Sequence, residues 1–100
     1  MQEKDIEKHL VKYAEQKGML TFKFTSPAKA GVCDRIFIHK GRVLFMEIKT
    51  LKGRLSPLQQ RHRENLQKHG ANYAVVYGLV DGRKVLTDFY ADVFFNGDFS

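Results

Sequence analysis

The sequence predicts an α/β domain in which helices flank a small mixed β-sheet, in the order αβββαβ(α). Three observations predict it: a stretch of helical periodicity opens the chain, a glycine turn joins two strand-like runs near its centre, and a capped helix separates these runs from a last apolar strand. One hundred residues suit a single domain with one modest core, so we take 1–100 as one unit.

The first elements are a helix and a strand. Over 3–17 the apolar residues recur with the spacing of one helical face, and Gly18 is a typical stop after the last turn. Residues 19–26 alternate as a strand does, and the stretch 28–31 reads as a loop. A helix packed on an edge strand is therefore expected at the N-terminus.

A hairpin is expected next. The run 33–40 has strand character, and Gly41 marks a tight turn into a second apolar run over 42–50. An antiparallel pairing through this turn brings the start of the first run beside the end of the second. Asp34 is then expected across from Glu47.

The second half of the chain supplies a helix, a strand and a short final helix. Ser56 is a suitable N-cap for a helix over 57–69, with proline at its first position and Gln59 at the capping-box position. The run 71–79 has an apolar centre that favours burial on both faces. Residues 81–95 favour one helix or two short turns.

The charge distribution points to a polyanionic partner. The formal net charge is +6, while the first 17 residues hold four acids and four lysines and cancel. Between residues 40 and 63 there are seven cations and one acid, which is typical of a nucleic-acid contact; the alternative is a merely soluble cationic surface. The seven are Lys40, Arg42, Lys49, Lys52, Arg54, Arg61 and Arg63.

Cysteine usage and the N-terminus favour a cytoplasmic protein. Cys33 is the single cysteine, so no intramolecular disulfide can form, as suits a reducing compartment. The N-terminal residues mix acids and bases and contain no apolar leader segment. The apolar runs are far shorter than the roughly 20 residues needed to cross a bilayer.

The hairpin brings together charged side chains that could form a reactive site. Glu47 and Lys49 share one face of their strand, because side chains alternate with period 2, and Asp34 lies opposite them. One interpretation is a surface salt bridge worth about 0–1 kcal/mol. The other is a metal site, because two close carboxylates repel unless a cation joins them, and Mg²⁺ commonly takes one or two carboxylates together with phosphate.

These residues carry a family resemblance. The ordered motifs G-x-x-D, E-x-K, K-G-R-x-S-P-x-Q and G-x-x-Y-x-V-V-Y resemble the VRR-NUC domain family of the PD-(D/E)xK nucleases, and the resemblance covers about residues 3–80. Stand-alone members of this family are typical of phages and bacteria. The PD-(D/E)xK signature usually has proline before the aspartate, where this chain has Cys33. The resemblance implies a restriction-endonuclease-like core and a bacterial or phage-infected cell as the location.

The resemblance also implies roles for individual residues. Asp34 and Glu47 would bind Mg²⁺, or Mn²⁺ in its place, with the backbone carbonyl of Ile48 as a further ligand, and Lys49 would be the catalytic lysine. Glu7 matches the acid that such nucleases often direct at the metal from the first helix, although a solvated helical glutamate explains it equally well.

The resemblance assigns roles to five more residues. One of them, a glutamine, has a second interpretation, and the other four are cations that would contact the substrate. Gln59 matches the family's helix glutamine near the active site, and a capping-box partner for Ser56 is the alternative. Four cations would contact DNA phosphates, which position a duplex without reading its sequence: Lys52, Arg54, Arg61 and Arg63.

The expected function is therefore a metal-dependent endonuclease. By resemblance it would be a homodimer that cuts branched DNA such as Holliday junctions. The alternatives are a restriction-like or repair nuclease acting on flaps or linear duplex, a non-catalytic DNA-binding module, and a protein acting on RNA. Aromatic residues near the C-terminus could build a twofold interface or complete the core of their own chain: Phe89, Tyr90, Phe94, Phe95 and Phe99.

Overall fold

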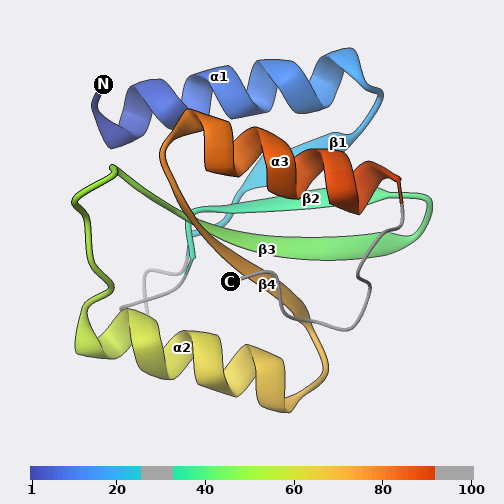
Figure 1. The fold of residues 1–100 in the computed structure, drawn as a ribbon. Helices are drawn as coiled ribbons and strands as arrows, with labels where there is room; N and C mark the ends of the chain where they lie inside the picture. The colour runs from blue at the N-terminus through green and yellow to red at the C-terminus, as the bar shows by residue number, and fades with distance from the viewer. Residues whose placement is uncertain (26–32, 92–100) are drawn as a thin grey trace.

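The computed structural model describes residues 1–25 and 33–91, which form a four-stranded mixed sheet between helices (Figure 1). Helices α1 and α3 cover one face of the sheet, and α2 lies on the other. The predicted α/β class and element order are confirmed. The elements are α1 (Glu3–Gln16), β1 (Leu20–Lys23), β2 (Arg35–His39), β3 (Arg42–Lys49), α2 (Pro57–Lys68), β4 (Asn72–Tyr77) and α3 (Leu79–Tyr90).

The strands lie in the order β1-β2-β3-β4. The pairs β1–β2 and β2–β3 are antiparallel, and β3–β4 is parallel. The β2–β3 turn is made by Lys40 and Gly41, both with positive φ, as two-residue hairpin turns require. A crossover that contains α2 connects the two parallel strands. It carries the chain from the end of β3 back to the edge of the sheet where β3 begins, so that β4 runs in the same direction.

The two faces of β3 have different surroundings. Leu44, Met46 and Ile48 are buried in the larger core, beneath α1 and α3. Phe45 packs on the smaller core of the α2 side, together with Tyr73 and other residues. Because side chains alternate along a strand, Glu47 shares the face of Phe45 and points to the α2 side.

Several boundaries differ from the prediction. The predicted strand 19–26 is regular only over Leu20–Lys23, at the edge of the sheet. The predicted strand 71–79 ends at Tyr77, because Gly78 adopts φ 90 and the next residue begins α3. The amide of Tyr77 donates to Asp81 Oδ2 at 2.8 Å, which links the end of β4 to the first turn of α3.

For the C-terminal aromatic residues, the structure decides between the two alternatives at Phe89 only. Phe89 is fully buried in the main core, so it completes the core of its own chain. Phe94, Phe95, Phe99 and the predicted loop 28–31 lie outside the described residues. In the part of the chain that the structure describes, none of the helices has the length and apolar character to cross a membrane.

Candidate active site

The β2–β3 hairpin places Asp34 beside the end of β3. Arg35 is the register partner of Met46, and the amide of Asp34 donates to the Met46 carbonyl at 3.0 Å. The Asp34 carboxylate in turn accepts a hydrogen bond from the amide of Ile48 at 2.8 Å. The hairpin therefore fixes the Asp34 carboxyl next to the Glu47–Lys49 segment, as the sequence predicted.

Glu47 is buried, with 2 % of its surface exposed. Its Oε2 accepts a hydrogen bond from Gln59 Nε2 at 3.1 Å and lies 3.8 Å from Lys49 Nζ. Its Oε1 is also buried and has no hydrogen-bond partner among the described residues. One carboxylate oxygen is thus held by protein groups, while the other is left for a ligand.

The charges around Glu47 favour a positively charged ligand. Burial raises the pKa of Glu47 to about 9, with the adjacent Asp34 carboxyl as the next cause, against the opposing effect of Lys49. Two carboxyl groups held this close need a proton or a cation between them.

Gln59 occupies both of the roles that its position allows. Its backbone amide donates to Ser56 Oγ at 3.1 Å, and its side-chain Oε1 accepts from the Ser56 backbone amide at 2.9 Å, which completes the capping box. Its remaining Nε2 reaches Glu47. The start of α2 is therefore bonded directly to the candidate site.

Comparisons with known proteins agree with this geometry. No model of a protein family matches the chain. The chain is 36% identical over 67 residues to “Putative nuclease p44” of Acyrthosiphon pisum secondary endosymbiont phage 1, an alignment that spans 66% of this chain and 72% of that protein. The chain also superposes on a solved structure described as a VRR_NUC domain with a TM-score of 0.81 and 27% identity, over 88% of this chain and 97% of that one.

The chain belongs to the VRR-NUC domain family. The resemblance seen in the sequence motifs is confirmed, and with it the assignment to a family of nucleases.

The donor set of this VRR-NUC site suits a hard cation. Mg²⁺ takes oxygen ligands and usually keeps waters, so one or two carboxylates suffice on the protein side. Asp34 and the unpaired Oε1 of Glu47 supply such oxygens. The described residues contain no group of three or more His, Cys, Asp or Glu side chains arranged around one point, so further ligands would come from backbone, as expected for Ile48, or from water and substrate.

Glu7 is not brought together with Asp34 and Glu47. Its carboxylate binds Arg35 Nη1 at 2.9 Å and lies 3.6 Å from Lys23 Nζ. Arg35 follows Asp34 directly, so its side chain projects from the opposite face of the hairpin, toward α1. Glu7 therefore belongs to an ion-pair network on the α1 side of the sheet.

Another acid of the first helix has a minor electrostatic effect on Glu47. The charge of Glu3 contributes to the raised pKa of Glu47, behind burial and Asp34. Sequence reasoning missed Glu3 in favour of Glu7. The two lie one turn apart on the same helix, so their spacing shows that they are alternatives without deciding between them.

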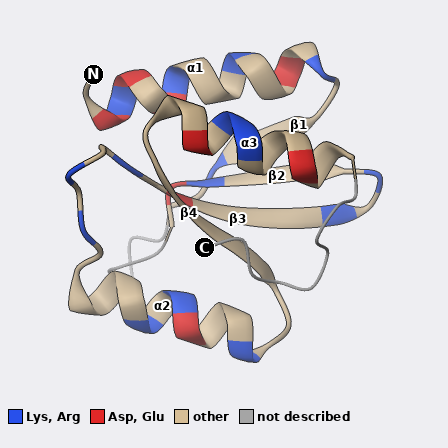
Figure 2. Cartoon of the chain, viewed as in Figure 1, with Lys and Arg blue, Asp and Glu red and all other residues tan. Residues whose placement is uncertain are grey.

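The predicted phosphate-binding residues differ in exposure. Lys52, Arg54 and Arg61 are exposed, on the loop after β3 and on α2 (Figure 2). Arg63 is half-buried, and its charge acts on Tyr73 in the smaller core. Cys33, which replaces the usual proline, is buried, and its burial raises the pKa of its thiol to about 12. It therefore stays protonated as a small core residue.

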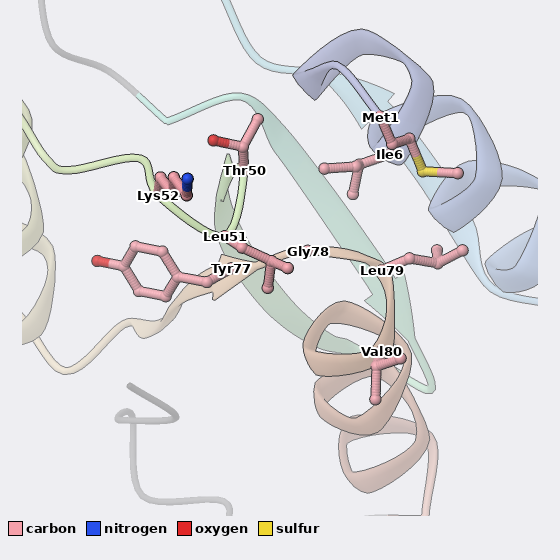
Figure 3. A pocket seen from close by; sticks show the side chains of 9 residues that line it. All are labelled: Met1, Ile6, Thr50, Leu51, Lys52, Tyr77, Gly78, Leu79 and Val80. Atoms are coloured by element: carbon pink, nitrogen blue, oxygen red, sulfur yellow. The ribbon is translucent and has the colours of Figure 1, made fainter.

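A largely apolar hollow of about 410 Å³ opens where β3 and β4 end (Figure 3). Thr50, which directly follows Lys49, lies at one side of it, and Leu51 and Val80 line it with most of their surface exposed. Its lining consists of Met1, Ile6, Thr50, Leu51, Lys52, Tyr77, Gly78, Leu79 and Val80.

Proposed function

We propose that this VRR-NUC protein is a metal-dependent endonuclease that hydrolyses phosphodiester bonds in DNA, with Mg²⁺ as the ion and Mn²⁺ as its substitute. The observation that carries the proposal is the open Oε1 of buried Glu47 beside the Asp34 carboxyl, with Lys49 on the other oxygen. A surface salt bridge explains neither the burial of Glu47 nor its unpaired oxygen.

Asp34 and Glu47 would hold the ion, with the backbone carbonyl of Ile48 as the expected further ligand. When bound, the ion supplies Lewis-acid polarisation of the phosphate and lowers the pKa of a water molecule. The amide of Ile48 keeps the Asp34 carboxylate in place at 2.8 Å. Gln59 fixes Glu47 Oε2 at 3.1 Å, so that Oε1 keeps a single orientation.

Lys49 would act on the reacting groups. Its ammonium lies 3.8 Å from Glu47 Oε2, and 8 % of the residue's surface is exposed, at the end of β3. From there it would orient the attacking water or neutralise charge that develops on the phosphate. Exposed Lys52, Arg54 and Arg61 would hold the DNA backbone on the α2 side.

The finer proposal concerns the substrate. We propose selectivity for branched DNA such as Holliday junctions, because the described residues contain no helix-turn-helix element that would read base sequence. Symmetric cleavage of a junction needs two active sites, so the protein would act as a homodimer. The bacterial or phage-infected cytoplasm is the proposed location, in line with the phage relative that carries the name of a nuclease.

Cleavage assays test the proposal. Labelled four-way junction, flap and linear duplex are incubated with the protein in Mg²⁺, Mn²⁺ or EDTA, alongside Lys49→Ala and, as a control on an exposed helix position, Lys84→Ala. We expect paired symmetric cuts in the junction, with metal, by the wild type and the control. A wild type that cuts nothing, or a Lys49→Ala variant as active as the control, contradicts the nuclease assignment.

The same assay separates the alternatives. Cuts confined to flaps or to linear duplex would replace the junction with a repair or restriction-like substrate. Tight DNA binding without cleavage in any metal would indicate a non-catalytic DNA-binding module. Light scattering on the same sample measures the mass in solution, and a monomer of 11.6 kDa at cleavage concentrations would contradict the homodimer.

A further inference from the structure

A second hollow, of about 260 Å³, lies between α1 and the outer strands β1 and β2. It is rich in cations, although its residues come from three separate elements. One carboxylate faces four basic side chains, so the lining carries a formal charge of four minus one, or +3. We call it the α1 pocket, and its lining consists of Lys4, Glu7, Lys8, Val11, Lys23 and Arg35.

The floor of the α1 pocket is fixed in position. Arg35 donates from Nη1 to Glu7 at 2.9 Å and from Nε to Thr21 Oγ1 at 3.2 Å. Both charged side chains of this pair are 15% exposed. Glu7 therefore neutralises the charge of Arg35. Lys23 is the second cation near Glu7: its Nζ lies 3.6 Å from Glu7 Oε2, and its side chain is mostly exposed.

The rim of the pocket has an excess of positive charge. Lys4 and Lys8 are four residues apart on α1, a spacing at which like charges repel, and neither pairs with an acid among the described residues. The acids of the first turn are directed elsewhere. Asp5 accepts a hydrogen bond from the Gln2 amide, and Glu3 is not among the residues that line the pocket. Charges that cancel along the sequence are thus separated in space.

An anion relieves this repulsion, and the position of the pocket indicates which anion. Arg35 directly follows Asp34, so the pocket and the catalytic carboxylates lie on opposite faces of the same end of the hairpin. The basic loop with Lys52 and Arg54 leads to the α2 side (Figure 2). A straight duplex along that loop stays on one side of the sheet, whereas two diverging arms reach both.

We infer that the α1 pocket binds the backbone phosphates of a second DNA arm, so that the protein holds a branched substrate from both sides of its sheet. This inference rests on the proposed function and deepens it. It assigns the choice of branched over linear DNA to residues on the face away from the catalytic centre. Lys4 and Lys8 then contact phosphate directly, and Arg35 with Glu7 keeps the pocket in shape.

Binding measured without metal tests the inference. The double variant Lys4→Gln/Lys8→Gln changes exposed side chains only, and Lys12→Gln/Lys84→Gln is its control, with the same loss of charge outside the pocket. Fluorescence anisotropy in EDTA follows binding to a four-way junction and to a linear duplex, over a range of salt concentrations. For the pocket variant we expect about tenfold weaker junction binding and a slope of log K against log salt reduced by about 2. Its duplex binding, and both affinities of the control, should stay within about twofold of wild type.

Two results overturn the inference: a pocket variant that binds the junction as the control does, or one that loses junction and duplex binding equally. Both readouts are independent of cleavage. A wild type that cuts no DNA in metal therefore refutes the proposed function, while a selective loss of junction binding still supports the pocket. Conversely, metal-dependent junction cleavage with unchanged binding by the variant refutes the pocket alone.

Discussion

The side-chain amide of Gln59 donates a 3.1 Å hydrogen bond to the buried carboxylate of Glu47, joining α2 to β3. The same glutamine closes the capping box with Ser56 at the start of α2. Helix initiation and the orientation of the proposed catalytic carboxylate therefore depend on one residue. The following substitutions separate these two contributions.

Gln59→Glu is expected to keep the helix and lose the activity. Glutamate also serves at this capping-box position, so the unfolding midpoint should change little. A third carboxylate beside Glu47 would replace a hydrogen-bond donor with a repelling charge. We expect single-turnover cleavage to fall about tenfold or more, by analogy with the effect of outer-shell partners at metal sites. Cleavage at the wild-type rate would show that the contact with Glu47 has no part in the reaction.

Lys49→Met should abolish most of the cleavage without unfolding the protein. Methionine retains most of the length and volume of the buried stem but removes the ammonium 3.8 Å from Glu47. Loss of one charge-stabilising group costs about 10²–10³-fold in turnover. Rates are measured at saturating DNA, with Lys84→Met on exposed α3 as control. A fall confined to DNA affinity would assign Lys49 to binding instead.

Glu3→Gln and Glu7→Gln should have opposite signatures. Glu3 is exposed and its charge is the weakest of the causes that raise the pKa of Glu47, so its loss should weaken metal affinity by about twofold or less. Glu7 holds Arg35 at 2.9 Å, so its loss should cost stability, about 1–2 kcal/mol, and leave metal affinity unchanged. Calorimetric titration with Mn²⁺ and thermal unfolding measure the two effects. The reverse pattern would assign the metal-facing role to Glu7.

Without metal, the protein should become less stable as the pH rises. The pKa of Glu47 in the folded state is about 9, well above its ordinary 4.5, so the folded protein binds this proton more tightly than the unfolded chain does. The resulting stabilisation is complete below pH 4.5 and is lost as the pH rises toward 9. We expect the unfolding midpoint in EDTA to fall between pH 5 and pH 9, and Glu47→Gln to flatten this decline.

Adding Mg²⁺ at pH 8 should raise the unfolding midpoint of the wild type, because a cation takes the place of the proton between the two carboxyls. Glu47→Gln removes one of the two carboxylates and should show a smaller rise. An equal rise in both proteins would place the ion elsewhere.

Local signals account for what the sequence predicted correctly. Gly41 and the alternation on either side of it define the hairpin and its register, and the register places Asp34 across from Glu47. The capping residues likewise define the start of α2 at Pro57. Each of these signals depends on neighbours within a few positions of the chain.

The parts that the sequence did not predict depend on packing between distant elements. The choice between Glu3 and Glu7 is made by the way Ile6 and Leu10 bury α1 on the sheet, which turns Glu7 toward Arg35. The same rotation collects Lys4 and Lys8 beside Lys23, although charges in the first 17 residues sum to zero. Composition cannot reveal such a separation, because it contains no information about which faces meet.

Helix α2 contributes no buried residue, in contrast to α1 and α3. Its contacts with the smaller core are partly buried: Leu66 packs there, His62 lies against the rings of Phe24 and Tyr73, and the capping box orders the first turn. Opening of this helix therefore disturbs less apolar packing than opening of any other helix, and its backbone amides should exchange with solvent first. Gln59, which restrains Glu47, therefore lies on the helix that we expect to open most easily. Local opening of this helix can then release the proposed catalytic carboxylate while the sheet stays folded.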